Sequence, residues 1–227
     1  MTEASTLPPL TSGPSQLTVD RFTALRRGPL VPFCSKIGSL LIEDCGLHPR
    51  HFADDTQIYG FCSPMQSSCT ELRSRISECV DVASSWMRSH RLQLNTARTE
   101  IIWLTTGRRS HALPQQHLRV GSDLITPVLV VRDFGIHTDA DVSMRSHVMK
   151  TTSACVAVLC RLRGIRCSLS RTVFQSLVSC LVLPRLDYCN AVLAGVPVHL
   201  ARRLQSVMNA VARLVLASSK CDHITPF

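Results

Sequence analysis

HFADDTQIYG, residues 51–60, combines an acidic pair with flanking apolar and β-favouring residues, and the rest of the sequence is organised around it. The adjacent carboxylates Asp54 and Asp55 follow two apolar residues and precede TQIY, whose residue types favour β-strands. A strand, an acidic turn and a second strand predict a β-hairpin. Two neighbouring carboxylates repel each other unless a positive charge lies beside them, so in a cleft this pair suits a hard cation such as Mg²⁺. The alternative is an ordinary polar turn, because short acidic motifs also arise by accident.

The segments around the hairpin predict a mixed α+β fold. Apolar residues recur every three or four positions from 67 to 88, which indicates an amphipathic helix that lies on a sheet. A short helix is expected to end near Gly46, before the hairpin. Strands are expected at residues 100–105, 118–120, 124–125 and 127–134, with a turn at 121–123.

From residue 143 the apolar residues follow a helical period, which predicts three helices. Gly164 lies near the end of the first helix, Pro184 breaks or kinks the second, and Pro197 opens the third. Asp187 is the only acidic residue between positions 143 and 218. The basic residues there are Arg145, Lys150, Arg161, Arg163, Arg166, Arg171, Arg185, Arg202, Arg203 and Arg213. This imbalance predicts a surface that follows phosphate groups, since arginine can hold phosphate oxygens bidentately.

Six segments carry a family resemblance, and they occur in the family's order. They are FADDTQ (52–57), WM with LQLNTARTE (86–87 and 92–100), RDFGI (132–136), LDYCN (186–190), the stretch 204–214, and HITP (223–226). These segments resemble the catalytic hairpin, the block after it, the primer grip, and the thumb with its continuation in the reverse transcriptases of non-LTR (LINE-type) retrotransposons. The resemblance runs from about Ser39 to the C-terminus.

The resemblance implies an α+β fold in which a partial polymerase palm is followed by an all-α thumb. The palm, with its β-hairpin, crossover helix, short antiparallel strands and primer grip, would occupy residues 39–141. The thumb would occupy residues 142–218, and residues 219–227 would be a truncated tail. Residues 1–38 contain five of the twelve prolines and many Ser and Thr residues, and they predict a flexible leader.

The resemblance also implies the residues of a nucleotidyl-transfer site. Asp54 and Asp55 would be catalytic and would bind Mg²⁺ or Mn²⁺. Four residues would contact the nucleotide or the template: Phe52, Arg98, Phe134 and Gly135. The family's further aspartate belongs on an earlier strand, in an apolar-Asp-x-x-x-Ala-Phe-Asp block that this sequence lacks, and Asp20 is the only aspartate before residue 39. Arg98 stands at the family's lysine position, where arginine keeps the charge but stays protonated.

Three interpretations follow from this pattern. In the first, the chain is an enzyme: a reverse-transcriptase domain protein, truncated and inactive as an isolated chain, that polymerises once it pairs with a complementing chain that supplies the fingers. In the second, it is a non-catalytic basic remnant that binds an RNA template or an RNA–DNA hybrid through backbone contacts. In the third, it is a decayed reading frame whose product does not fold stably, because a palm without its central strand exposes a sheet edge.

Composition and charge agree with a folded protein that binds nucleic acid. The apolar fraction of 45% is enough for a core, and 25 Lys and Arg residues against 16 Asp and Glu residues give a net charge of +9, which attracts phosphate backbones. Eleven cysteines without a Cys-x-x-Cys spacing predict an intracellular protein, cytoplasmic or nuclear. No stretch approaches the roughly 18 continuous apolar residues of a membrane span, so no membrane partner is expected.

Overall fold

The computed structural model describes the backbone of residues 15–23, 31–52, 55–63, 66–92, 94–105 and 116–216. Within these ranges it describes the side chains from residue 38 onward, except at positions 52 and 66. The chain divides into two compact units. The first consists of Met1–Val131 and Ala140–Val142, and the second consists of Arg132–Asp139 and Ser143–Phe227.

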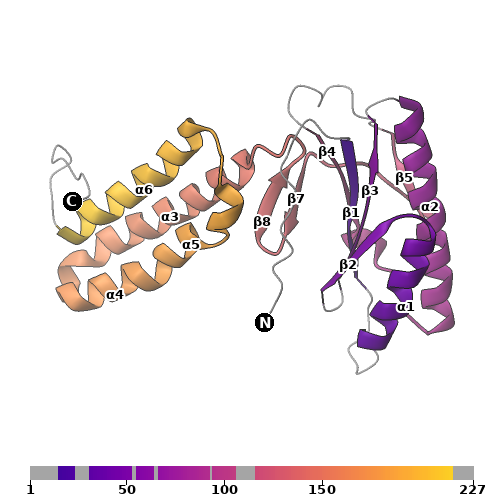
Figure 1. The fold of residues 1–227 in the computed structure, drawn as a ribbon. Helices are drawn as coiled ribbons and strands as arrows, with labels where there is room; N and C mark the ends of the chain where they lie inside the picture. The colour runs from indigo at the N-terminus through magenta and orange to yellow at the C-terminus, as the bar shows by residue number, and fades with distance from the viewer. Residues whose placement is uncertain are drawn as a thin grey trace, which may run out of the picture. The chain divides into compact units, whose positions relative to one another are not determined.

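The first unit is built on a four-stranded antiparallel sheet with two helices on one face (Figure 1). Its elements in chain order are β1 (Ser15–Thr23), α1 (Val31–Asp44), β2 (His48–Phe52), β3 (Asp55–Cys62), α2 (Gln66–Ser89), the 3-10 helix η1 (Thr96–Arg98) and β4 (Glu100–Leu104). The strands lie in the order β2-β3-β1-β4, and each neighbouring pair is antiparallel. This βαββαβ succession is that of ferredoxin-like domains.

The core of the first unit lies between the sheet and its helices. Leu72, Ile76 and Val80 are buried along one side of α2, where the three- and four-residue spacing predicts an apolar face. They belong to one cluster with Ile58 of β3 and Ile101 of β4. The predicted helix at residues 67–88 and the predicted strand at residues 100–105 are therefore confirmed. Each buried side chain of this size contributes roughly 1.5–3 kcal/mol of hydrophobic stabilisation.

The structure differs from the predicted flexible leader at residues 15–23 and 31–38. Residues 15–23 form β1, which pairs with β3 on one side and with β4 on the other. Residues 31–38 form the first part of α1, which is longer than the short helix that the sequence predicts. The physical reason is tertiary pairing, because the backbone groups of a strand between two others are satisfied on both sides whatever the local composition. Residues 1–14 and 24–30 lie outside the described residues.

The end of α1 agrees with the sequence prediction. The helix ends at Asp44, and Gly46 has a φ of 68°, a left-handed conformation that glycine adopts without strain. The Arg75 guanidinium of α2 donates hydrogen bonds to the carbonyl oxygens of Cys45 and Gly46 at 3.1 and 2.6 Å. These bonds satisfy carbonyl groups at the end of α1 and tie its C-terminus to α2.

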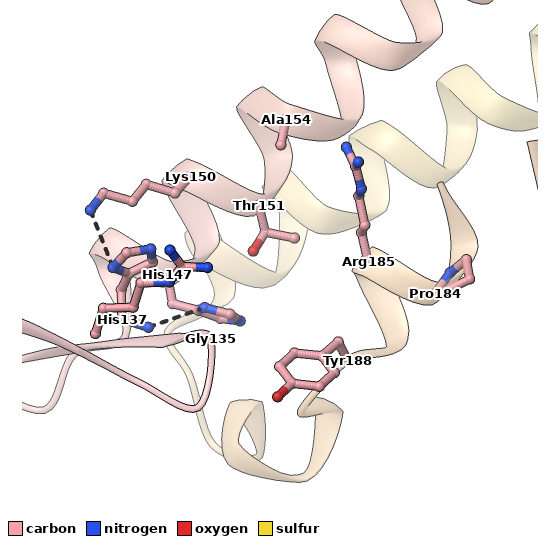
Figure 2. A pocket seen from close by; sticks show the side chains of 10 residues that line it. Gly135, His137, His147, Lys150, Thr151, Ala154, Pro184, Arg185 and Tyr188 are labelled. Carbon is pink, nitrogen blue, oxygen red and sulfur yellow. Dashed lines mark hydrogen bonds between the residues drawn. The ribbon is translucent and has the colours of Figure 1, made fainter. Parts of the chain in front are cut away.

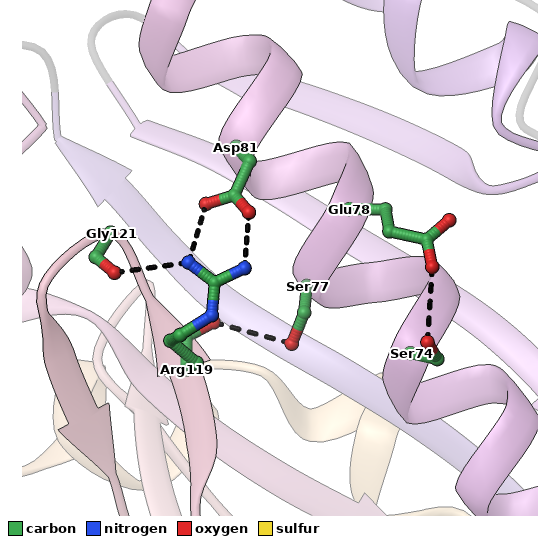
Figure 3. Close-up of polar contacts among 6 residues, drawn as sticks. All are labelled: Ser74, Ser77, Glu78, Asp81, Arg119 and Gly121. Atoms are coloured by element: carbon green, nitrogen blue, oxygen red, sulfur yellow. Dashed lines mark hydrogen bonds and ion pairs between the residues drawn. The ribbon is translucent and has the colours of Figure 1, made fainter.

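A small hairpin, β5 (Leu118–Val120) and β6 (Asp123–Ile125), packs beside α2. Gly121, with a φ of 63°, makes the predicted turn. Figure 3 shows how the hairpin is attached: the Arg119 guanidinium forms an ion pair with Asp81, and the Ser77 hydroxyl donates to the Arg119 carbonyl oxygen at 3.3 Å. The side chains of Leu118 and Val120 are buried in the core of the unit, so the hairpin is held by apolar packing as well as by charge.

The second unit contains a hairpin tip and a set of helices. The strands β7 (Val130–Asp133) and β8 (Ile136–Asp139) are followed by α3 (Arg145–Ile165), η3 (Arg166–Ser168), α4 (Arg171–Leu181), α5 (Leu183–Asp187), η4 (Asn190–Leu193) and α6 (Val198–Leu216). Pro184 lies in the first turn of α5, directly after α4 ends, and α6 begins after Pro197. The predicted helix break at Pro184 and the predicted helix start at Pro197 are confirmed. Ser170 caps α4 by accepting a hydrogen bond from the Val173 N–H at 3.3 Å.

Two apolar clusters hold these helices together. The larger contains Cys155, Phe174, Val178 and Val207 from α3, α4 and α6.

The elements of both units make the fold a mixed α+β arrangement with small antiparallel sheets, as the sequence predicts. None of the helices in the described ranges combines the length and the apolar character that a bilayer span requires.

We expect a large difference between the effects of two substitutions on α2. Ile76→Ala should lower the free energy of unfolding by about 2–5 kcal/mol, because Ile76 is fully buried and the substitution leaves a cavity. Asp81→Asn should leave the stability close to that of the wild type, because the Asp81–Arg119 ion pair is exposed to solvent. Urea denaturation measures both. A large loss from Asp81→Asn would mean that charge rather than packing attaches the β5–β6 hairpin.

Candidate nucleic-acid interface

The acidic stretch forms the hairpin that the sequence predicts. β2 and β3 are antiparallel, with His51 opposite Thr56 and Phe52 opposite Asp55. The His51 Nδ1 and the Thr56 hydroxyl lie 2.9 Å apart and link the strands near the turn. Asp55 is the first residue of β3 and is half-buried. Asp54 lies outside the described residues, as does the side chain of Phe52.

The two faces of β3 carry different kinds of side chain. Ile58, Gly60 and Cys62 are buried on the face that α2 covers. Tyr59 and Phe61 alternate with them and therefore lie on the opposite face, where Phe61 is 51% exposed. Asp55 lies on this second face by the same alternation. Asp55 thus lies at one end of a strand whose open face carries aromatic side chains.

Four side chains from β2 and β3 form an aromatic–basic patch: His48, Arg50, Tyr59 and Phe61. The His48 ring centroid lies 5.2 Å from that of Tyr59 and 5.9 Å from that of Phe61, and the Tyr59 and Phe61 rings meet edge to face. The Arg50 guanidinium carbon lies 5.4 Å from the Tyr59 ring centroid, which is a cation–π contact. Exposed aromatic rings beside a basic group are the features on which unpaired bases stack.

Strand β1 runs directly beside the acidic hairpin. Its register with β3 sets Thr23 opposite Asp55 and Phe22 opposite Thr56, with an irregularity between Val19 and Phe22. On its other side the register with β4 sets position 20 opposite Glu100. Asp20, the only aspartate before residue 39, therefore lies on the strand next to the hairpin, three positions from the partner of Asp55.

The described residues do not supply a complete metal site. Among the side chains that the structure describes, no three His, Cys, Asp or Glu residues lie together as a metal ion would require. Mg²⁺ commonly takes one or two carboxylates and keeps several waters. Of the predicted ligands only the Asp55 side chain is described, and one carboxylate does not define a two-ion centre. The Mg²⁺ or Mn²⁺ site therefore stays a prediction.

The other predicted site residues lie in two places. Arg98 is exposed in η1, two residues before Glu100 of β4, and so belongs to the first unit. Phe134 and Gly135 form the turn between β7 and β8 in the second unit. Their φ angles, 44° and 83°, are both in the left-handed region. The Phe134 carbonyl oxygen accepts a hydrogen bond from the Tyr188 hydroxyl, so the RDFGI and LDYCN segments are in contact.

The structure adds residues that the sequence prediction did not select. Tyr59 belongs to the predicted hairpin and Phe61 follows it, and the sequence prediction gives neither a functional role, although their alternation with buried residues marks an open face. Arg50 and His48 precede the hairpin and carry no motif signal. The position of Glu100 opposite Asp20 depends on strand pairing between distant segments, which the sequence does not display.

No family model, no curated protein and no solved structure matches this chain.

Gly135 should be sensitive to substitution, whereas a glycine of α3 should not be. A Cβ at position 135 would lie 3.3 Å from Tyr188 Cε1, at a φ of 83°, so Gly135→Ala combines a close contact with a left-handed backbone. We expect it to lower the free energy of unfolding by about 1–2 kcal/mol. The control is Gly164→Ala in α3, where a Cβ meets nothing within 4 Å and a helical alanine should stabilise by about 0.5–1 kcal/mol. Thermal or chemical unfolding of both variants measures the contrast.

The stability should fall on mild acidification. Burial lowers the pKa of His147, an effect that Asp139 partly opposes, and burial also lowers the pKa of His51. In the unfolded chain an imidazole titrates near pH 6.5. As the pH falls through this value, the unfolded chain binds protons that the folded chain does not, so folding free energy is lost until the pH drops below the folded pKa values.

We therefore expect the melting temperature to fall between about pH 8 and pH 5. His147→Gln should show a smaller fall, because it removes one of the buried imidazoles that must charge. Differential scanning calorimetry across this range measures it. An unchanged pH dependence in the variant would contradict the assignment to His147.

Proposed function

We propose that the chain is a palm and thumb of the reverse-transcriptase type, related to those of non-LTR (LINE-type) retrotransposons, that binds an RNA template and an RNA–DNA hybrid. The observation that carries the proposal is the sheet register, in which Asp55 lies opposite Thr23 of β1 and the open face of β3 carries aromatic side chains. This is the relation that the family resemblance requires between a catalytic hairpin and an earlier strand. The first unit is the proposed palm, and the helices of the second unit are the proposed thumb.

The chemistry of the open face suits a nucleic acid strand. Tyr59 and Phe61 offer ring faces to bases, and Arg50 adds a positive charge beside them. The helices of the second unit add a large excess of arginine, which contacts phosphates without reading the sequence. We therefore expect binding that depends on salt concentration and little on base sequence.

We do not expect the isolated chain to polymerise nucleotides. Two-metal catalysis needs carboxylates from two strands. Asp20 lies on a neighbouring strand, but the block that surrounds the corresponding aspartate in the family is missing from this sequence. Arg98 keeps a positive charge near β4 but cannot donate a proton as lysine can. A complementing chain that supplies the fingers is the proposed partner for any synthesis.

Binding to an RNA–DNA hybrid should weaken when the aromatic rings are removed. Tyr59→Ala and Phe61→Ala should each cost about 1–3 kcal/mol of binding free energy if the ring stacks on a base. The control is Leu124→Ala in β6, which removes an apolar side chain that is more exposed than Tyr59 and Phe61 and lies outside the aromatic–basic patch. Fluorescence anisotropy with labelled hybrid and with single-stranded RNA measures the affinities. Equal affinities for the wild type and the two ring variants would show that the open face of β3 does not contact the nucleic acid.

A second candidate function, nucleotidyl transfer, is favoured by one observation, the position of Asp20 on β1. Primer extension on an RNA template, with Mg²⁺ and then Mn²⁺, separates the two functions. The proteins to compare are the wild type, Asp20→Asn and the double variant Asp54→Asn, Asp55→Asn. We expect no extension from any of them, with hybrid binding retained. Extension by the wild type that both variants abolish would establish polymerase activity and would assign Asp20 to the same site as the hairpin carboxylates.

A further inference from the structure

The second unit contains a cavity of about 530 Å³ between the β7–β8 turn, α3 and α5 (Figure 2). Arg132 and His137 line it from the hairpin, His147 and Lys150 from α3, and Arg185 and Tyr188 from the segment that begins at α5. This volume lies within the range of small-ligand sites, roughly 300–1,000 Å³. Among the residues that the structure describes, no Asp or Glu lines the cavity.

The charges around this cavity are not balanced by carboxylates. Among the described residues, Arg132, Lys150 and Arg185 form no ion pair, whereas Arg119 of the first unit is paired with Asp81. The nearby carboxylate of Asp139 is engaged elsewhere. It accepts hydrogen bonds from the Ser146 N–H at 3.0 Å and the Ser143 hydroxyl at 3.4 Å, at the start of α3. The described lining therefore carries the positive charges of Arg132, Lys150 and Arg185, which an anion would neutralise, while Asp139 and Asp133 lie close enough to act on His137, His147 and Tyr188.

Hydrogen bonds hold the walls of the cavity in place. The backbone N–H of His137 donates to His147 Nδ1 at 3.4 Å, which joins β8 to α3. The Lys150 ammonium lies 3.2 Å from His137 Nδ1, which can accept a hydrogen bond only while the imidazole is neutral. Burial lowers the pKa of His137, and the charges of Lys150 and Arg132 lower it further. The Tyr188 hydroxyl donates to the Phe134 carbonyl oxygen and fixes the third wall.

We propose that this cavity holds a phosphate group of a bound nucleic-acid strand, with Lys150 and Arg185 as its two cationic contacts from different helices. The source of the phosphate rests on the proposed function. Arginine can hold two phosphate oxygens in a bidentate pair, and lysine contributes a compact charge from the other helix. Figure 2 shows the Arg185 and Tyr188 side chains on one side of the cavity and Lys150, with Thr151, on the other. The half-exposed ring of Tyr188 offers an apolar surface to the sugar or base next to the phosphate.

The test compares variants that lose one positive charge each. Lys150→Met and Arg185→Met remove cavity charges, and Arg88→Met removes an exposed arginine of α2 in the first unit, which belongs neither to the cavity nor to the aromatic–basic patch. The three side chains are exposed, so the fold should tolerate each change, and circular dichroism with thermal melting checks this. Affinity for a short fluorescent RNA–DNA hybrid is measured at several salt concentrations.

We expect each cavity variant to bind the hybrid about tenfold more weakly, because each loses a charged hydrogen bond. The slope of the logarithm of affinity against the logarithm of salt concentration should fall by nearly one per lost phosphate contact. Arg88→Met should change the affinity by less than about twofold, because this charge lies outside the proposed phosphate contacts and exposed charges are screened by salt. A loss of the same size in Arg88→Met would overturn the inference, because it would show a general charge effect.

Failure of the inference can be told apart from failure of the proposed function. If the wild type binds the hybrid and both cavity variants bind it equally well, the cavity does not hold a phosphate, but the proposed function stands. If the wild type binds no hybrid, the proposed function fails, and with it the nucleic-acid source of the phosphate. Titration with inorganic phosphate, followed by the NMR signals of His137 and His147, then tests the cavity alone. Shifts in the wild type that are absent in the Lys150→Met, Arg185→Met double variant would support an anion site, and their absence would overturn it.

Discussion

Strand β3 must bury one face and expose the other, and the rest of the first unit depends on how its pairing meets both requirements. The side chains of Ile58 and Cys62 are buried beneath α2, while Phe61 on the other face is exposed. A slip of one residue in the pairing would exchange the two sets, so that apolar side chains would face water and Asp55 would enter the core. The hydrophobic free energy of one face therefore fixes the register, and this register places Asp55 on the open face at the start of the strand.

β1 supplies the strand pairing that the β2–β3 hairpin needs to be stable. A two-stranded hairpin is at best marginally stable in water, and β3 would otherwise present an unpaired edge. β1 pairs with that edge and also with β4, so it joins the hairpin to the strand that follows α2. The irregularity in the pairing between Val19 and Phe22 lies close to position 20, and such bulges change the direction of the strand locally. The structural role of β1 thus explains its position without any reference to catalysis, which is why only a functional assay can assign Asp20.

How much the sequence predicts depends on how local each signal is. The hairpin, α2, β4 and the helix boundaries at Pro184 and Pro197 were predicted, because alternation, helical period and proline act within one segment. β1 was not predicted, because SQLTVDRFT is short, lies in a proline-rich region and gains its stability from pairing with distant strands. The cavity of the second unit was not predicted either. Its lining comes from three separate segments, and the count of arginines indicates a basic surface without saying which charges meet.

The charge of Arg119 in the first unit and the charges around the cavity of the second unit have different surroundings. In the first unit, Arg119 has a carboxylate partner and its charge is used within the fold. The Asp139 carboxylate likewise accepts a hydrogen bond at the start of α3, where the helix dipole and the free N–H groups favour an anion. The positive groups around the cavity have no such partner among the described residues, and like charges gathered at one place lower the stability of a fold rather than raise it. An anion in the cavity would interact favourably with all of them at once. A cluster of like charges lowers the stability of the folded state, and a bound anion would restore it. We therefore attribute this cluster to the proposed binding of an anion rather than to the stability of the fold.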